Sequence, residues 1–399
     1  MVYKKNLVKN FVVTSNAGLK LYDDLWAKHD LSQTFDNIVP KQSGASTGNI
    51  MQNLFFRNLI DANSMVSLAE KDKEEYFLAK NAKLHRTSYG RNLKKLDDEQ
   101  RRKVLLKFND KLVPRKKADK KALMIYDRTA IEVFGKEYEN TAWVWDSCQE
   151  KMVKGYGLDK FMLKTKKKVT VFGFDVNNKT QDNVIEFFKR GRMSHGANRV
   201  AFDADPELTS MDFYKRLGGE ELVFYTKAVK SWKFNYGLDF NIEELRKKVL
   251  PLLKRNKLVS RIVYKGDMEL RLVFSLKDKR VILTNDFKSK PAEVYKCYVD
   301  RWKIETSFRE EKQNLGLNIL PIRKLEGIKT HFLLCMLAYV LSQFIINKVK
   351  IADGIKLIKR KLVRVWAVIT QKYNRLVLEF DIRYEHIKTF NKLLEMLNS

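Results

Sequence analysis

The stretch YVDRWKIETSFREEK, residues 298–312, holds the spacing on which the fold and the site depend. Within it, Tyr298, Arg301, Glu305 and Lys312 stand at offsets of 0, 3, 7 and 14 residues. Because an α-helix turns by about 100° per residue, these side chains would fall within an arc of roughly 60°. The spacing therefore predicts one polar stripe along a helix.

A continuous helix is predicted from Pro291 to Leu315, since proline is favoured at the first helical position and nothing within the run breaks it. Cys297, Ile304 and Phe308 form an apolar stripe beside the polar one. Geometry alone leaves two interpretations open. The polar stripe is either a solvated salt-bridge face, or a functional site at the margin of a buried face, where reduced solvation strengthens electrostatic interactions.

The charge balance of the chain points to a polyanionic partner. Its 399 residues include 78 Lys and Arg against 48 Asp and Glu, a formal net charge of +30. Such an excess repels itself in a compact fold unless a polyanion offsets it, and nucleic acid is the first candidate. The three cysteines and five histidines are scattered, which indicates neither a disulfide framework nor a zinc site. Any metal would be held mainly by carboxylate oxygens, which favours magnesium or manganese.

Residues 1–118 are predicted to form a mostly helical region that ends in a basic linker. The segment RTSYGRNLKKLD, residues 86–97, places Arg86 and Arg91 in a short helix of the kind that enters a DNA groove, although short polar helices are also common elsewhere. The linker RRKVLLKFNDKLVPRKKADKK, residues 101–121, is interpreted as following phosphates rather than as a plain spacer. This region is therefore predicted to bind DNA.

Short apolar runs of strand length begin near Lys121. ALMIYD ends at Asp127 and NRVAFD ends at Asp203, with a predicted helix, TQDNVIEFFKRG, before the second run. Strands in series, followed by alternating helices and strands, indicate an α/β fold with a mixed sheet flanked by helices. Residues 119–230 and 287–350 are assigned to this domain.

Two further segments complete the predicted organisation. Residues 231–286 are predicted to be a partly β insertion ahead of the helix at 291–315, and residues 351–399 a helical C-terminal region. The apolar stretch 331–349 carries polar residues, so a buried helix is preferred over a membrane span. The N-terminal MVYKKNLVKNFVV lacks the pattern of a secretion signal. A cytoplasmic protein without membrane contact is expected.

Three acids stand where a sheet and a helix would bring them together. Asp127 and Asp203 each close an apolar strand, and Glu305 lies on a helix able to pack against that edge. Such a set can hold two Mg²⁺ ions about 4 Å apart, which activate a water or hydroxyl and stabilise the leaving oxygen of a phosphate. Asp205 would point to the same side as Asp203 if the strand continued. Asp203 is preferred, because Pro206 indicates that the strand is ending.

The spacing Y-x2-R-x3-E-x6-K, filled by Tyr298, Arg301, Glu305 and Lys312, resembles the signature of the DDE transposases of insertion-sequence family four. The similarity in plan extends over residues 121–348 and includes the two aspartate motifs IYDRT and VAFDAD. A β-rich insertion before the glutamate and a helical tail also agree with that family. The predicted N-terminal helices are compatible with that family, but the resemblance does not extend to them.

The resemblance implies a ribonuclease-H-like fold in which Asp127, Asp203 and Glu305 are the catalytic ligands of two Mg²⁺ or Mn²⁺ ions. It also implies that the tyrosine, arginine and lysine of the signature engage the DNA end near the scissile phosphate. Arg309 lies just outside the stripe and would add a cation. Trp232, in the insertion, is a candidate for stacking on a flipped base, with a core or plain exposed tryptophan as the alternative.

The expected activity is that of an enzyme, a DNA transposase with endonuclease activity encoded by a prokaryotic insertion sequence. It would bind the ends of its element, cleave them and transfer the 3′ ends to target DNA. Double-stranded DNA is the expected partner, with a dimer in the synaptic complex and the nucleoid as the place of action. Two alternatives stay open: a catalytically inactive DNA-binding relative, and a basic RNA-associated protein, which would explain the charge but not the spacing.

Overall fold

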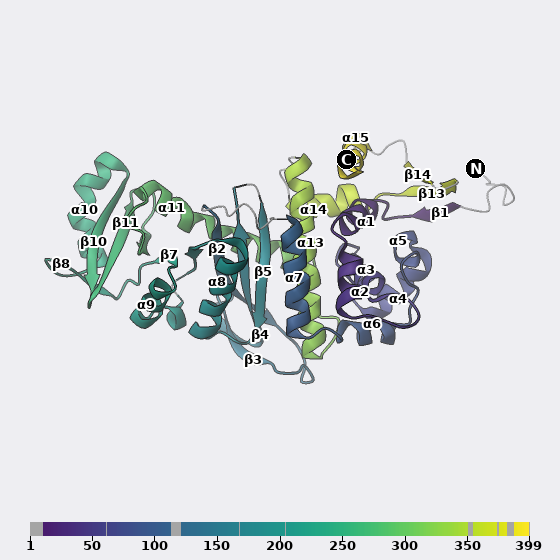
Figure 1. Ribbon diagram of the computed structural model, residues 1–399, viewed down its shortest axis with the longest axis horizontal. Coiled ribbons are helices and arrows are strands. Elements are labelled where there is room, and N and C mark those ends of the chain that lie inside the picture. Colours follow the sequence, from purple (N-terminus) through teal and green to yellow (C-terminus); the bar gives the residue numbers. More distant parts are fainter. Residues whose placement is uncertain are drawn as a thin grey trace. The chain divides into compact units, whose positions relative to one another are not determined.

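The computed structural model consists of two compact units, coloured along the sequence in Figure 1. Unit 1 comprises Met1–Lys111, Gly135–Asn140 and Arg309–Ser399, and unit 2 comprises Leu112–Phe134 and Thr141–Phe308. The residues that the structure describes are 11–60, 62–112, 121–166, 168–203, 205–349, 354–372, 375–380 and 387–398. The chain crosses from unit 2 to unit 1 inside one helix, so the units do not coincide with the domains expected from sequence.

Unit 2 is built on a mixed sheet in which five neighbouring strands follow the order β5–β4–β2–β6–β7. β4 runs antiparallel to β2 and to β5, whereas β6 and β7 run parallel to β2. These strands are β2 (Leu123–Glu132), β4 (Lys151–Lys164), β5 (Val169–Val176), β6 (Arg199–Ala201) and β7 (Val223–Lys227). Helices flank the sheet, which confirms the predicted mixed α/β fold of the ribonuclease-H-like class.

The segment 231–286 extends this sheet instead of forming a separate one. β12 pairs with β7, with Ile282 opposite Lys227, and the order continues through β11, β10, β8 and β9. Its elements are β8 (Lys233–Tyr236), β9 (Leu238–Asn241), α10 (Ile242–Asn256), β10 (Leu258–Lys265), β11 (Met268–Ser275) and β12 (Val281–Thr284). Asn241 and Glu244 form a capping box that starts α10. At the other end of the sheet, β3 (Ala142–Asp146) pairs with β4.

Helix α8 (Gln181–His195) covers one face of the sheet, beside β5 in Figure 1. It begins where the Thr180 side chain accepts a hydrogen bond from the Asn183 amide. Phe187 of α8 stacks on Phe161 of β4, with ring centroids 4.2 Å apart. Helix α9 (Met211–Gly219), which follows a short 3₁₀ turn, η1 (Pro206–Leu208), packs Tyr214 on the β7 residue Phe224 at 4.9 Å. Aromatic packing therefore fills this side of the core.

The opposite face of the sheet receives α12 (Trp302–Asn314). Successive side chains of a strand point to opposite faces, so Lys160 projects away from the side on which its neighbour Phe161 packs. Lys160 is fully buried and donates a hydrogen bond to Ser307 Oγ at 2.8 Å. Its Nζ also lies 4.7 Å from the centroid of the Phe308 ring. These contacts hold the first half of α12 on β4.

The predicted single helix from Pro291 to Leu315 is wrong in one respect, because the structure divides it into α11 (Pro291–Asp300) and α12 at Arg301. The Arg301 amide donates to Tyr298 O at 3.0 Å, and the Ile304 amide donates to Arg301 O at 3.0 Å. These are i to i+3 bonds, and they tighten the turn locally. The interruption involves no proline or glycine, so the local sequence does not predict it.

The predicted strand ends also differ from the structure. β2 does not end at Asp127 but continues to Glu132, because residues Arg128–Glu132 pair with Gly155–Asp159 of the long strand β4. Asp203 does not close β6 either, since that strand ends at Ala201.

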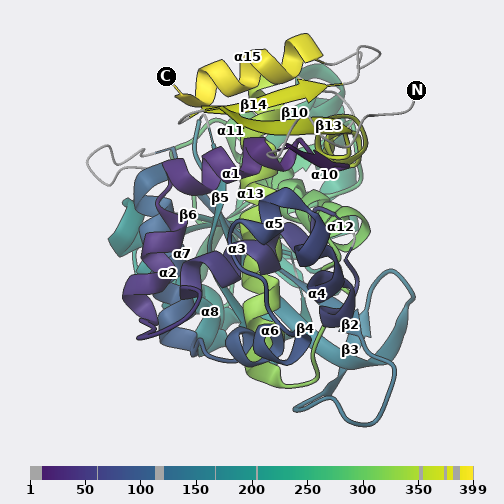
Figure 2. The same cartoon turned by 90° about the vertical axis from the view of Figure 1, so that its right-hand side faces the viewer.

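Unit 1 gathers helices around the long helix α13 (Leu325–Val349) (Figure 2). Two of its contacts are polar: the buried Tyr22 Oη lies 2.7 Å from Ser342 Oγ, and the buried Arg101 guanidinium bonds to the partly exposed Glu326 at 2.5 Å. The other helices of the N-terminal part are α1 (Leu19–Lys28), α2 (Leu31–Ile38), α3 (Thr47–Arg57), α4 (Met65–Glu74), α5 (Tyr76–Ala79), α6 (Arg86–Leu93) and α7 (Asp98–Leu112).

Helix α13 is long and apolar enough to cross a membrane by length and composition, with a mean hydropathy of 1.5 over a window in Leu325–Asn347. However, 78% of that window is buried inside the protein. The central helix of a folded unit has the same composition, so this is weak evidence for a membrane span and agrees with the predicted buried helix.

The prediction that residues 351–399 are helical is wrong for part of the segment. After α14 (Gly354–Ile358) and a π-helical turn, η2 (Lys359–Val363), the chain forms β13 (Ala367–Lys372) and β14 (Arg375–Phe380), and then α15 (Ile387–Asn398). β13 pairs with β14 and with β1 (Phe11–Thr14), and the three strands are labelled together in Figure 1. The runs AVITQK and RLVLEF are rich in β-branched and apolar residues, and the distant partner β1 favours the extended form.

The C-terminal segment makes close backbone contact with the start of α1. The Ala17 amide donates to Val365 O at 3.0 Å, and the Gly18 amide donates to Val363 O at 3.2 Å. A Cβ atom on Gly18 would lie 1.6 Å from Leu362 O. Only glycine allows the two backbones to approach this closely.

We therefore expect Gly18→Ala to lower the free energy of unfolding by about 1–3 kcal/mol, measured by urea denaturation, because the added methyl group forces the backbones apart. Gly90→Ala in α6 is the matched control, since the nearest atom to its Cβ would be Ile322 Cδ1 at 4.0 Å. That variant should be as stable as the parent protein or slightly more stable. Equal stability of the two variants would contradict the close approach.

Candidate active site

The carboxyl groups of Asp127, Asp203 and Glu305 surround one guanidinium in unit 2. Arg301 Nη1 lies 3.0 Å from Asp127 Oδ2, and Arg301 Nη2 lies 3.4 Å from Asp203 Oδ2 and 2.5 Å from Glu305 Oε1. The three acids belong to β2, to the segment after β6 and to α12. Residues far apart in the sequence therefore meet at one point of the fold.

The register of the central strands decides which face carries this cluster. Asp127 stands opposite Lys160 in the β2–β4 pair, so both side chains point to the same face. Lys160 contacts Ser307 and Phe308 of α12 on that face. Glu305 meets Asp127 through Arg301, whose guanidinium contacts both carboxylates.

The segment after β6 offers two aspartates with different partners. Asp203 faces Arg301 and also accepts a hydrogen bond from Tyr298 Oη at 3.3 Å. Asp205 instead accepts a hydrogen bond from Lys179 Nζ at 2.8 Å. The two acids therefore take part in separate ion pairs: Asp203 contacts Arg301, whereas Asp205 pairs with Lys179 and still acts on Asp127 through its charge.

Tyr298 closes the side of the cluster nearest Asp203. Its side chain is buried, with 3% of the residue exposed, and its ring lies 5.5 Å from the Arg301 guanidinium carbon. Burial, and then the Asp203 carboxylate, raise the pKa of the Tyr298 hydroxyl above its ordinary value. The hydroxyl therefore stays protonated at neutral pH and acts as a hydrogen-bond donor.

The electrostatics of the cluster are set by burial and by close opposite charges. Burial raises the pKa of Asp127 to about 7, while Arg301 opposes the rise and the Asp205 and Glu305 carboxylates add to it. Burial alone would lower the pKa of Arg301, but Asp127 and Asp203 raise it above its ordinary value. With its side chain only 4% exposed, the guanidinium remains charged and offsets part of the negative charge around it.

The donor set suits a divalent cation in type and in charge. Carboxylate oxygens are the ligands that Mg²⁺ and Mn²⁺ prefer, and three acids outnumber the single arginine among them. In the described ranges, no group of three or more His, Cys, Asp or Glu side chains is arranged to hold a metal ion. The three carboxylates converge on Arg301 instead. The residues thus fit a divalent cation chemically, while their present spacing fits a guanidinium.

Comparison with known proteins decides the family. A family described as "Transposase DDE domain" matches residues 72–341, more than half of the chain. The chain belongs to this transposase family. No curated protein matches it. Among solved structures it is similar to the Drosophila P element transposase strand transfer complex, at 11% identity, with 86% of this chain and 69% of that chain covered and a TM-score of 0.30.

Family membership confirms the predicted DDE transposase in its coarser form. The assignment to insertion-sequence family four, and the roles of the individual signature residues, stay predictions. Within the transposase, Tyr298, Arg301 and Glu305 lie together in unit 2, as described above. Lys312 lies further along α12 in unit 1, where it lines a small pocket with Arg57 and Asn58.

The remaining predicted DNA-binding residues lie outside the acid cluster. Arg309, on α12 in unit 1, is exposed, and so are Arg86 and Arg91 on α6. Trp232 is partly buried against the hydrophobic core, 5.8 Å from the Tyr214 ring, with Lys265 Nζ 5.4 Å from its own ring. Its surroundings are those of a tryptophan at the margin of the core.

Sequence reasoning missed two buried charged residues in β4, the strand that pairs with the strand bearing Asp127. Asp159 and Lys160 are both fully buried in the otherwise apolar run of β4. Asp159 accepts a hydrogen bond from Tyr126 Oη at 2.7 Å, and burial raises its pKa to about 6. Lys160 anchors α12 through Ser307. Two adjacent charges inside an apolar strand were the available signal, since buried charges are rare without partners.

We expect Arg301→Ala to lower the free energy of unfolding by about 3 kcal/mol, because it leaves three neighbouring carboxylates without their shared cation. This value is at the lower end of the destabilisation that usually follows the loss of one partner of a buried ion pair. Asp203 and Glu305 are partly exposed, so water screens their charges. The measurement is urea denaturation in a buffer that contains a chelator. Arg309→Ala, which removes an exposed arginine from α12, is the matched control and should change stability by no more than about 0.5 kcal/mol. A similar small effect of both substitutions would show that Arg301 does not hold the cluster together.

Proposed function

We propose that this transposase binds the ends of its own insertion sequence, cleaves the DNA there and transfers the freed 3′ ends to target DNA. The observation that supports the proposal is the convergence of Asp127, Asp203 and Glu305, from three separate elements, on Arg301. In the proposal these acids hold two divalent cations, Mg²⁺ or Mn²⁺. When bound, such ions would activate the attacking water or 3′ hydroxyl and stabilise the leaving oxygen.

The side chains around the acids would position the DNA. Arg301 has the planar fork of donors that grips a phosphate in bidentate fashion, and it is already held beside the carboxylates. Tyr298 would donate its hydroxyl hydrogen to an oxygen of the DNA end. Lys312 would add a point charge to the backbone of the same strand. The three residues match the polar positions of the family-four signature, and their roles come from that resemblance.

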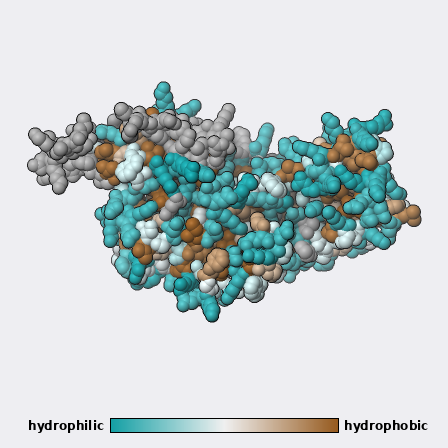
Figure 3. All heavy atoms as spheres, turned by 180° about the vertical axis from the view of Figure 1, so that it is seen from behind, coloured by the Kyte–Doolittle hydropathy of each residue, from teal (hydrophilic) through white to brown (hydrophobic). Residues whose placement is uncertain are grey.

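The net charge of +30 supports duplex DNA as the partner, since phosphates would offset it. On the face seen in Figure 3, most of the described surface is hydrophilic, with hydrophobic atoms in small groups among it. Arg86, Arg91 and Arg309 are exposed and would contact the DNA backbone. Trp232 is a further candidate, for a base near the cleavage point. We also propose a dimer in the synaptic complex and action on the nucleoid in the cytoplasm.

Cleavage of a duplex that carries the inverted repeats of the element, with Mg²⁺, tests the proposal. We expect Asp127→Ala, Asp203→Ala and Glu305→Ala each to reduce cleavage by at least about 100-fold, since even second-shell partners of a metal ligand cost about 10- to 100-fold. End binding, measured in Ca²⁺, should stay within about threefold, because phosphate contacts by Lys and Arg supply most of the affinity. Full cleavage by Glu305→Ala would overturn the proposal.

Two matched aspartate variants sharpen that test. Asp182→Ala removes an exposed carboxylate on α8 that pairs with Arg216, and it should cleave like the parent protein. Asp205→Ala removes the acid paired with Lys179 and should retain more activity than Asp203→Ala. The reverse order would assign the second catalytic position to Asp205. Binding without any cleavage by the parent protein would instead identify an inactive relative.

A further inference from the structure

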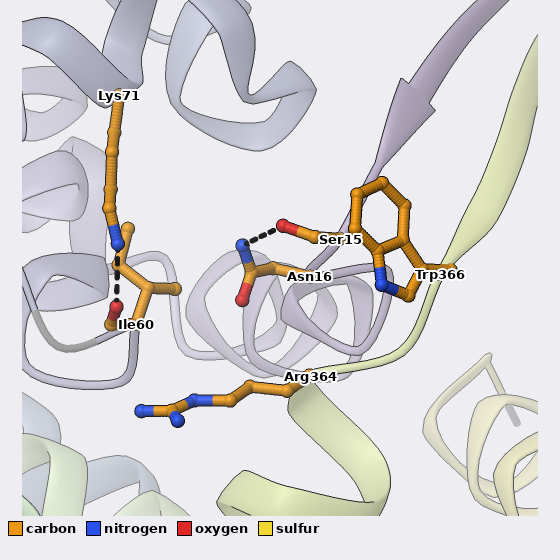
Figure 4. Close-up of a pocket in the computed structure, with 6 residues that line it drawn as sticks. All are labelled: Ser15, Asn16, Ile60, Lys71, Arg364 and Trp366. Atoms are coloured by element: carbon orange, nitrogen blue, oxygen red, sulfur yellow. Dashed lines mark hydrogen bonds between the residues drawn. The ribbon is translucent and has the colours of Figure 1, made fainter.

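Unit 1 contains a pocket of about 380 Å³ that lies outside the acid cluster (Figure 4). It is lined by Ser15, Asn16, Ile60, Lys71, Arg364 and Trp366. These residues come from the link between β1 and α1, the region around α4, and the link between η2 and β13. The pocket is therefore assembled from both ends of the chain, and its size is within the usual range for small-molecule sites.

One wall of the pocket is an exposed indole. Trp366 is 64% exposed, whereas Trp26, in the same unit, is 1% exposed. An exposed tryptophan beside a pocket presents a flat aromatic face to anything that enters. Stacking on such a face is the standard way in which proteins hold an unpaired base.

Two cations stand on the other side of the pocket. Figure 4 shows the side chains of Lys71 and Arg364 extending to the side opposite Trp366. Lys71 Nζ donates a hydrogen bond to Ile60 O at 2.9 Å, which fixes the position of the ammonium group. Arg364 is exposed and lines the same pocket, and a guanidinium is a cation whose fork of donors suits a phosphate.

The polar floor between these walls has a fixed orientation. Asn16 is 8% exposed, and its Nδ2 donates to Ser15 Oγ at 3.0 Å and to Glu75 Oε2 at 3.0 Å. The buried Glu75 carboxylate also accepts from the Thr14 hydroxyl. Because a carboxylate only accepts, the amide nitrogen of Asn16 must face it, and Oδ1 is left as an acceptor at the pocket. Asn16 Oδ1 is thus able to receive an amino or imino hydrogen of a base.

We propose that this pocket binds one unpaired nucleotide of a DNA strand, with the base on Trp366 and its phosphate between Lys71 and Arg364. The assignment to DNA rests on the proposed function. A base in a duplex has both faces covered by its neighbours, so only an unpaired nucleotide can use the indole. The exposed positions of Trp366 and Arg364 keep the pocket open to a strand that continues on either side.

The test is fluorescence anisotropy of the full chain with a short labelled single strand and with a duplex of the same sequence, in EDTA so that no cleavage occurs. We expect Trp366→Ala to weaken binding of the single strand about tenfold, because one stacking contact with a base is lost. Binding of the duplex should change by less than about twofold. Trp366→Phe should retain most of the affinity. Arg364→Ala should reduce the slope of log affinity against log salt for the single strand by about 0.7, the loss of one phosphate contact.

Trp145→Ala is the matched control, since Trp145 on β3 of unit 2 is 57% exposed and lies outside the pocket. It should leave single-strand binding unchanged. Equal losses in Trp145→Ala and Trp366→Ala, or equal losses for single strand and duplex, would overturn the proposal. Tighter binding of RNA than of DNA of the same sequence would overturn the assignment to DNA. None of these binding measurements depends on cleavage. A negative result for the pocket therefore does not affect the cleavage test of the acid cluster, and a negative cleavage result does not affect the binding test of the pocket.

Discussion

The ion-pair cluster of Arg301 with three carboxylates is the interaction on which the site depends. Carboxylates this close repel one another, most strongly where water is partly excluded, and a cation among them offsets the repulsion. Arg301 fills that position and is almost fully buried while doing so. Each acid arrives from a different element, and the guanidinium is the common point that fixes their mutual positions.

That cluster in turn depends on the register of β2 and β4. Asp127 faces α12 because Lys160, directly opposite it, faces α12 as well. A shift of one residue would turn Asp127 toward the face covered by Phe187 and α8, away from Arg301. The buried Lys160 therefore anchors α12 on β4 through Ser307, and it lies on the same face of the sheet as Asp127.

The signature spacing and the strand pattern were sufficient to predict the mixed α/β sheet and the meeting of Glu305 with Asp127 and Asp203. They were insufficient for features that depend on partners far away in the sequence. The run AVITQK becomes a strand because β1 and β14 lie on either side of it, and the local sequence does not contain that information. The turn at Arg301 was also hidden, since its residues are compatible with an unbroken helix. Asp159 and Lys160 were visible as charges in an apolar run, but their roles depended on pairing register.

The pairing of β1 with β13 has a consequence for the order in which the protein can mature. β1 leaves the ribosome well before Ala367–Lys372 does, so β1 and the first amides of α1 lack their partners until that later segment has been made. Helices α1 to α7 can form before then, but the sheet of β1, β13 and β14 closes only after both later strands have emerged. Until that point β1 presents an unpaired strand edge.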